Sequence, residues 1–458
     1  MNTLRLSITL CVALALIASP RPSRGDAQPG RIFPTHIPAT DAPADDQRNF
    51  PTSWSPQDVR WAADVDGYGQ SSPAVWGDAA YLTSVIGENK ETLQITCVDL
   101  ATGKTRWAHS TPSTFPTQSG PMVSRAAPSP VVDAAGLYAF FESGDLLMLD
   151  HAGKLVWKRS LQSDHGTFVN KFGLSATPAQ TADRLFVLLD HSGDSSLVGI
   201  DKASGKTAFV SDRGKRAHSW SSPAIIRVGQ EPLVVCSSVG SIDAYSATGK
   251  LLCSYSKVGG NSVATPYDLG DGEFLVSSLV RPADGPSENA LVSNLLAKIV
   301  NRGDDYAIEV KWVAEEARGS FSSPVKQNGF VYFINPQGIL FCLDAQSGKQ
   351  HYAKRTPSGA CWATPFPVGD RLYLFGKDGT TSVIRVGETF DIISEGSRAW
   401  PADADADDQP PAARPGAGPA AGPASGPTLY AAVPTSDGFL IRRGDRLYRI
   451  APPTPSTR

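Results

Sequence analysis

The chain has 458 residues, of which 41% are hydrophobic and 19% are charged, and its formal net charge is −3. This is the composition of a globular protein, and the lack of a basic excess argues against nucleic-acid binding, which normally needs a positively charged patch. The 42 glycines and 36 prolines indicate a fold with many turns.

The first 27 residues are predicted to be a secretory signal peptide. Arg5 precedes an apolar run from Leu6 to Ala18, and the small residues Gly25 and Ala27 predict cleavage after Ala27. The run is shorter than the ~20 residues that cross a bilayer. We therefore expect an exported protein without a membrane span, which is periplasmic or extracellular after cleavage.

Two segments have the composition of linkers. Residues 28–50 are rich in proline, and we expect a flexible tether there, ahead of a folded domain over residues 51–452. Within that domain, residues 401–427 are a low-complexity stretch of Ala, Gly and Pro that is expected to be disordered. Its opening acidic residues, Asp403 to Asp408, lack the Gly and the distal Glu of an EF-hand loop, so a solvated linker is predicted rather than a calcium site.

One unit recurs along the chain. It opens with Ser-Pro or Thr-Pro, or with Val-Pro in the last copy. Five copies end with Gly-Lys, and the position four residues after the Gly, called the marked position, is usually aromatic. The opening prolines are Pro73, Pro130, Pro178, Pro223, Pro266, Pro324, Pro365 and Pro434. The glycines are Gly103, Gly153, Gly205, Gly249 and Gly348, and the marked positions hold Trp107, Trp157, Phe209, Cys253 and Tyr352. Such a period, with four short apolar strands in each unit, predicts an all-β propeller of eight four-stranded antiparallel blades.

The turn that ends each unit has a physical rationale. An Asp before Thr/Ser-Gly-Lys caps backbone amides, and the glycine accepts the positive φ of a hairpin turn. The aromatic that follows is expected to pack between neighbouring blades.

The two ends of the domain are expected to pair. The last unit stops after Leu447–Ile450 and has no Gly-Lys turn, whereas a strand over residues 59–65 lies before the first opening proline. Trp61 in that strand occupies the place of the missing aromatic. Pairing of strand 59–65 with the C-terminal blade would close the ring and remove exposed sheet edges.

Five cysteines follow the signal peptide, at positions 97, 236, 253, 342 and 361. Their number is odd, no two are adjacent and no Cys-x-x-Cys occurs, so neither a disulfide framework nor a metal site is predicted. Cys97 and Cys342 share one repeat position, which predicts a slot for a small packed side chain.

The segment from Cys97 to Trp107, CVDLATGKTRW, resembles the tryptophan-docking repeat of quinoprotein alcohol dehydrogenases and of the wider PQQ-like propeller group, which includes the BamB-type outer-membrane assembly factors. Similar segments run from Gly199 to Phe209 and from Cys342 to Tyr352. In dehydrogenase members the resemblance would imply PQQ and Ca²⁺ over the channel, an Asp base and adjacent cysteines. This chain has no adjacent cysteines, and no metal set or catalytic Asp is placed by motif. No catalytic residue, metal or cofactor is therefore predicted, and PQQ with calcium is left as an alternative without motif support.

The residues before the opening prolines are expected to approach the mouth of the central channel. Three residues before each proline stand Gln70, Ala127, Ser175, Trp220, Val263, Phe321, Trp362 and Ala431. From these and neighbouring positions we select one candidate ligand site, made of Gln70, Arg125, His218, Trp220, Asn261, Arg318 and Trp362. These side chains would suit an anionic or aromatic group. The alternative is that they only solvate the rim of the channel.

Three functions stay open at this point. The leading hypothesis is a monomeric, non-enzymatic scaffold of the cell envelope, similar to BamB-type factors, that recognises a protein or peptide, because propeller faces carry freely variable loops. The second is a quinoprotein-like oxidoreductase with PQQ over the central channel. The third is a small-ligand or carbohydrate-binding module that uses the Trp-lined mouth.

Overall fold

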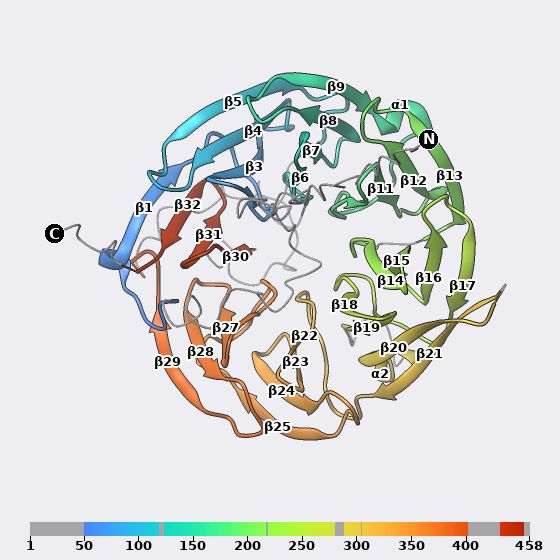
Figure 1. Cartoon of the computed structure of the whole chain (residues 1–458). Helices are drawn as coiled ribbons and strands as arrows, with labels where there is room; N and C mark the ends of the chain where they lie inside the picture. The colour runs from blue at the N-terminus through green and yellow to red at the C-terminus, as the bar shows by residue number, and fades with distance from the viewer. Residues whose placement is uncertain are drawn as a thin grey trace, which may run out of the picture.

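The computed structural model describes residues 50–118, 123–216, 219–279, 288–303, 305–401 and 431–452. In these ranges the strands form eight four-stranded antiparallel sheets arranged around a central channel (Figure 1). The eight-bladed propeller predicted from the sequence is confirmed. The predicted signal peptide, the predicted tether except Phe50, and the insertion at 401–427 except Pro401 lie outside the described residues.

Blades 1 to 7 each consist of four consecutive strands, which run from the channel to the rim (Figure 1). Blades 1 to 4 are β2 (Ala74–Trp76), β3 (Ala79–Ile86), β4 (Thr92–Asp99) and β5 (Thr105–Pro112); β6 (Val131–Asp133), β7 (Gly136–Phe140), β8 (Asp145–Leu149) and β9 (Leu155–Ser160); β10 (Ala179–Gln180), β11 (Arg184–Leu189), β12 (Ser195–Asp201) and β13 (Thr207–Gly214); and β14 (Ala224–Val228), β15 (Glu231–Ser238), β16 (Ser241–Ser246) and β17 (Leu251–Tyr255). Blades 5 to 7 are β18 (Tyr267–Gly270), β19 (Glu273–Val276), β20 (Leu295–Asn301) and β21 (Tyr306–Val313); β22 (Val325–Gln327), β23 (Phe330–Ile334), β24 (Ile339–Asp344) and β25 (Gln350–Arg355); and β26 (Phe366–Val368), β27 (Arg371–Phe375), β28 (Thr381–Arg385) and β29 (Ile392–Ser397). The short helices are η2 (Pro56–Asp58), α1 (Leu161–His165) and α2 (Glu288–Leu291).

Blade 8 is built from both ends of the domain. Its inner strands are β30 (Ala431–Pro434), β31 (Phe439–Arg443) and β32 (Arg446–Ile450), and its outer strand is β1 (Val59–Asp64). In the antiparallel register, Trp61 lies opposite Arg449. The predicted closure by the N-terminal strand is confirmed, because β1 covers the edge of β32 and gives blade 8 its fourth strand.

The two faces of the disc carry different connections. Because neighbouring strands are antiparallel, successive connections alternate between the faces. On one face, which we call the turn face, all connections are short, and the longest spans residues 386–391. On the other, the mouth face, the long connections over residues 113–130, 161–178, 277–294 and 398–430 begin and end, and the described parts of these connections exclude 119–122, 280–287 and 402–430. The connections that differ most in length from blade to blade therefore belong to one face of the disc.

An aromatic contact between blades repeats around the rim. Trp61 Nε1 donates to Leu100 O at 2.9 Å, and the ring lies against Gly103, where a Cβ would come within 2.5 Å of it. The same bond joins Trp107 to His151 O, Trp157 to Lys202 O and Trp312 to Ala345 O, each at 3.0 Å. The repeat glycine thus serves twice, since Gly103 has a φ of 72° and also leaves room for the ring of the preceding blade. The predicted packing of the repeat aromatic between blades is confirmed.

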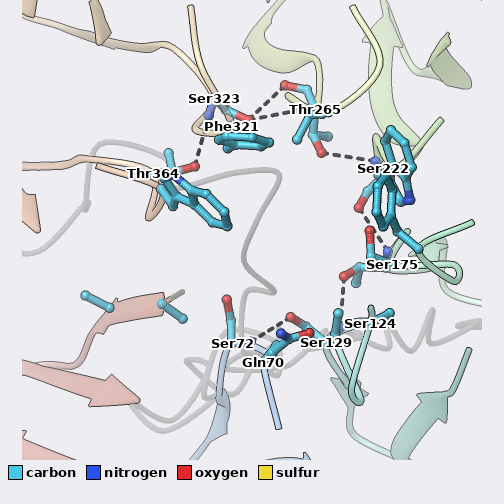
Figure 2. A pocket seen from close by; sticks show the side chains of 18 residues that line it. Gln70, Ser72, Ser124, Ser129, Ser175, Ser222, Thr265, Phe321, Ser323 and Thr364 are labelled. Carbon is cyan, nitrogen blue, oxygen red and sulfur yellow. Dashed lines mark hydrogen bonds between the residues drawn. The ribbon is translucent and has the colours of Figure 1, made fainter. Parts of the chain in front are cut away.

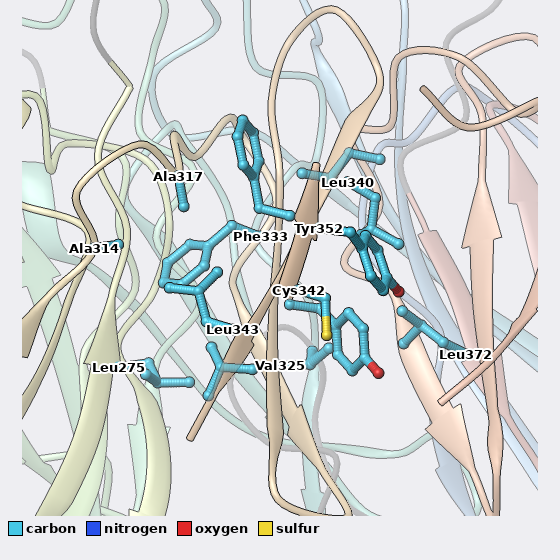
Figure 3. Packing of buried hydrophobic residues seen from close by; sticks show 14 of the residues in the cluster. Leu275, Ala314, Ala317, Val325, Phe333, Leu340, Cys342, Leu343, Tyr352 and Leu372 are labelled. Atoms are coloured by element: carbon cyan, nitrogen blue, oxygen red, sulfur yellow. The ribbon is translucent and has the colours of Figure 1, made fainter. Parts of the chain in front are cut away.

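Apolar side chains fill the space between adjacent blades. Figure 3 shows one such layer, in which Leu275 of blade 5, Val325 and Cys342 of blade 6 and Leu372 of blade 7 belong to one buried cluster. All five cysteines of the described chain are free thiols. Cys97 and Cys342 are 1% and 0% exposed, as the predicted slot for a small packed side chain requires. In the sheet Cys342 lies opposite Tyr352, Cys97 opposite Trp107 and Gly199 opposite Phe209, so the small residue sits beside the aromatic of its own blade.

Within the described ranges, no helix is long and apolar enough to cross a membrane.

Candidate functional site

A cavity of about 390 Å³ opens in the central channel, on the side of the mouth face. All eight residues that stand three positions before an opening proline line it, as their repeat position predicts: Gln70, Ala127, Ser175, Trp220, Val263, Phe321, Trp362 and Ala431. The cavity is therefore built from all eight blades, and each blade contributes at the start of its innermost strand.

A ring of hydroxyl groups holds the blades together around this cavity. The residue before each opening proline in blades 1 to 7 is Ser or Thr, and the backbone N–H of one blade donates to the hydroxyl of the next (Figure 2). The bonds are Ser72 N to Ser129 Oγ (2.9 Å), Ser129 N to Thr177 Oγ1 (2.9 Å), Thr177 N to Ser222 Oγ (2.9 Å), Ser222 N to Thr265 Oγ1 (3.2 Å), Thr265 N to Ser323 Oγ (3.1 Å) and Ser323 N to Thr364 Oγ1 (3.1 Å). We call this set the hydroxyl ring. It satisfies buried amides and leaves hydroxyl groups at the cavity wall.

Two pairs of aromatic rings line the cavity. The Phe172 and Trp220 ring centroids are 5.7 Å apart, and those of Phe321 and Trp362 are 4.3 Å apart. Figure 2 shows Phe321 reaching the cavity from the side opposite Gln70. The rings provide broad apolar faces beside the polar wall of the hydroxyl ring.

None of the 18 described residues that line the cavity carries a charge. Two cations stack on aromatic rings of the lining: Lys377 Nζ lies 4.3 Å from the centre of Trp362, and Lys171 Nζ lies 5.3 Å from the centre of Phe172. Burial lowers the pKa of Lys377. Ser124, only 5% exposed, is among the lining residues, and its Oγ is buried without a hydrogen-bond partner among the described residues.

A family model described as "Outer membrane protein assembly factor BamB" matches residues 53–171 and 299–444, which is more than half of the chain. The chain belongs to the BamB family. The resemblance read from the docking repeats is thereby confirmed. A search of curated proteins finds no match to this BamB-family chain.

Solved structures share the fold at low sequence identity. BamB from Moraxella catarrhalis is 12% identical, with a TM-score of 0.55 over 85% of this chain and 98% of that chain. Quinohemoprotein alcohol dehydrogenase from Comamonas testosteroni is 10% identical, with a TM-score of 0.53 over 87% of this chain and 77% of that chain. The computationally designed protein Ika8 is 12% identical, with a TM-score of 0.50 over 85% of this chain and 98% of that chain. These likenesses show the fold alone, because fold does not fix chemistry.

Three of the seven candidate ligand residues line the cavity of this BamB-family protein: Gln70, Trp220 and Trp362. Arg125 lies just outside and is tied to Gln70, because Gln70 N donates to Arg125 O at 3.0 Å and Arg125 N donates to Gln70 Oε1 at 2.9 Å. The Arg125 guanidinium stacks on Tyr68, 3.6 Å from the ring centre. Their role in ligand binding stays a prediction.

The other candidate residues are not brought to the cavity wall. Asn261 is fully buried and donates through Nδ2 to Ser237 Oγ at 2.9 Å and to Ser241 O at 3.0 Å, so it fixes a loop of blade 4. Arg318 donates to two nearby backbone carbonyls in its own loop. His218 lies outside the described residues.

Two kinds of residue at this site were not predicted from the sequence. The hydroxyl ring was visible as Ser or Thr before proline in seven of the eight units, but its bonding role was not inferred. Phe172 and Ser124 lie in the long mouth-face connections, whose different lengths leave no repeat register from which to place them.

The PQQ and Ca²⁺ that the sequence resemblance would imply for dehydrogenase members do not fit these residues. PQQ is a tricarboxylate that such enzymes hold with Ca²⁺, and calcium takes oxygen ligands that include carboxylates. The cavity wall offers uncharged groups, and the described residues contain no group of three or more His, Cys, Asp or Glu side chains that could hold a metal ion. We derive no redox chemistry from this site.

Proposed function

We propose that this chain is an exported, non-enzymatic scaffold of the cell envelope that binds a protein or peptide partner across its mouth face. The one-sided placement of the long connections carries the proposal. Binding residues are concentrated on loops held by a rigid scaffold, and here the turn face offers almost none. The family description, an outer membrane protein assembly factor, supports a protein partner in the envelope.

The mouth face has exposed apolar side chains that a partner could cover. Val169 is 55% exposed in the connection 161–178, and Val239 is 45% exposed in the turn between β15 and β16. Leu291 and Val292, each 43% exposed, stand in the connection 277–294. Apolar groups that remain accessible next to polar loops are typical of protein-binding surfaces.

Buried ion pairs hold the mouth-face loops in place. Lys90 Nζ of blade 1 lies 3.1 Å from Glu142 Oε1 of blade 2, and both side chains are 3% exposed. Between blades 3 and 4, Arg213 contacts Asp190 at 2.8 Å and Asp243 at 3.2 Å. A surface fixed before binding loses less conformational entropy when the partner docks, which favours affinity.

Site-specific photo-crosslinking in the native envelope tests this proposal. A photoreactive residue at Val169 or Val239 reports on the mouth face, and the same residue at Lys104 or Lys154, which are exposed in turn-face hairpins, provides the matched control. We expect one envelope protein to be captured from both mouth-face positions and from neither control. The purified partner should then bind the intact chain in solution. Equal labelling from the two faces, or capture from the controls only, would contradict the proposal.

A further inference from the structure

We propose that the channel cavity is a binding site for an uncharged, hydroxyl-bearing ring, that is, a neutral mono- or disaccharide. This goes beyond the proposed function, which concerns partner binding across the loops of the mouth face. It rests on the size, the aromatic faces, the hydroxyl groups and the lack of charge of one cavity.

The cavity has the size and rigidity of a small-molecule site. Its volume of about 390 Å³ falls within the ~300–1,000 Å³ typical of ligand sites. Its wall is fixed by the hydroxyl ring, whose bonds run from Ser72 in blade 1 to Thr364 in blade 7. A preformed wall lets contacts with a ligand contribute directly to affinity.

The aromatic pairs provide surfaces for the C–H faces of a sugar. Phe172 with Trp220, and Phe321 with Trp362, line the cavity from blades on different sides of the ring. The face of an aromatic ring carries partial negative charge, and the C–H groups of a pyranose carry partial positive charge. A flat sugar ring can therefore stack on either pair while its hydroxyl groups point sideways.

The polar wall matches those hydroxyl groups. A serine or threonine hydroxyl has one hydrogen and two lone pairs. Thr177 and Ser222 each accept the N–H of the preceding blade and are only 3% and 2% exposed. The partly exposed hydroxyl-bearing residues of the cavity wall are Ser72, Ser175 and Thr364. Ser323 is different, because its hydroxyl also donates to Thr265 O at 3.1 Å. Alternating donors and acceptors of this kind pair with a polyol as well as with water.

The lack of charge selects against acids and amines. A charged ligand in this cavity would lose hydration without gaining an opposite charge, since no lining residue among those described is ionisable at neutral pH. Arg125 and Lys377 lie outside the lining and stack on Tyr68 and Trp362. This disfavours the anionic ligand that the sequence alone had indicated.

Isothermal titration calorimetry with a small panel tests the proposal. D-glucose and maltose are the neutral probes, D-glucuronate and D-glucosamine are their charged counterparts, and N-acetylprolinamide stands for a neutral peptide group. We expect a neutral sugar to bind with a Kd on the order of 1 mM or tighter. The charged sugars should bind at least about tenfold more weakly, because their charge has no partner in the cavity.

Variants locate the binding. Phe321→Ala should abolish measurable binding, with Phe390→Ala as the aromatic control outside the cavity. No heat with either neutral sugar, equal binding of charged and neutral sugars, binding of N-acetylprolinamide alone, or equal effects of the paired variants would each overturn the proposal.

Discussion

The joints between blades 1 to 7 and the joint that closes the ring through blade 8 are made differently. Along blades 1 to 7 the inner contact is the hydroxyl ring, one bond per joint. In blade 8 the residue before the opening proline is Val433, which has no hydroxyl to accept the N–H of Thr364. The repeated hydroxyl contact therefore joins blades 1 to 7 and is replaced at blade 8, which combines both ends of the domain.

Other residues take over on both sides of blade 8. Toward blade 1, the fully buried guanidinium of Arg442 donates to Ser71 Oγ at 2.5 Å and to Thr83 O at 2.8 Å. Toward blade 7, the N-terminal segment inserts Trp54, whose ring centroid is 4.8 Å from that of Phe439 and 6.5 Å from that of Phe375. A repeated joint is thus specified by residues close in sequence, whereas the closing joint depends on residues that the repeat does not contain.

The largest expected effect is loss of the closing segment. Deleting residues 50–65, in a chain that begins at residue 28, removes Trp54, Trp61 and all of β1. We expect the melting temperature to fall by more than ~10 °C, because the outer strand of blade 8 and its rim contact disappear together. Thermal melts followed by circular dichroism measure this against the undeleted chain. An unchanged melting temperature would show that the ends do not hold the ring closed.

Arg442→Met tests the inner contact of the closing joint. The substitution leaves Ser71 and the Thr83 carbonyl without their charged donor, so we expect a loss of about 2–4 kcal/mol in the free energy of unfolding. Burial lowers the pKa of Arg442 to about 9, and the removal of this desolvation offsets part of the loss. Urea denaturation provides the measurement. Arg385→Met, at a half-exposed arginine of blade 7, is the control and should change stability by less than ~0.5 kcal/mol.

A reciprocal pair of substitutions compares the two kinds of joint directly. Thr265→Val should cost about 1–2 kcal/mol, because the N–H of Ser222 loses its acceptor. Val433→Thr should change stability by less than ~0.5 kcal/mol, because Val433 packs in the apolar cluster around Phe366, where a buried hydroxyl offsets any bond it gains. If Val433→Thr raised the free energy of unfolding by more than ~1 kcal/mol, the closing joint would differ from the other joints only by the missing hydroxyl group.

The smallest effect is a pH dependence at the joint between blades 1 and 2. Burial raises the pKa of Glu142 above its usual value of 4.5, and Lys90 opposes this rise. The stability linked to the protonated carboxyl is present below pH 4.5 and is lost as pH rises through the raised pKa. The stability of the native chain minus that of Glu142→Gln should therefore fall as pH rises above 4.5, by no more than ~1.4 kcal/mol per pH unit. Urea titrations at several pH values would contradict this if the difference increased with pH.

What the sequence predicted correctly was fixed by repeat register. The same sequence separation from a repeated proline or turn applies in every blade, so the position of one copy predicts the positions of the others. This holds for Trp61, Gly103 and the cavity residues Gln70 and Trp362. Asn261 lies in a connection whose length differs from blade to blade, so its separation from the opening proline does not predict where its side chain points.

The parts that escaped prediction depend on distant chain segments. Arg442 is buried by a blade that begins some 370 residues earlier in the chain, as its bond to Ser71 shows. The burial of Ser124 Oγ, which has no partner among the described residues, likewise depends on segments from several blades. Neither has a local pattern that periodicity could reveal.

The pairing of β1 with β32 sets an order of events during synthesis. Val59 is made early and meets Ile450 only after every other blade has been made. A contact this distant carries a large loop-closure entropy and forms slowly. The nascent chain therefore passes through a stage in which seven blades can assemble while the first strand waits with an unpaired edge, and protection of that edge from other chains is a requirement on whatever machinery handles the protein before the circle closes.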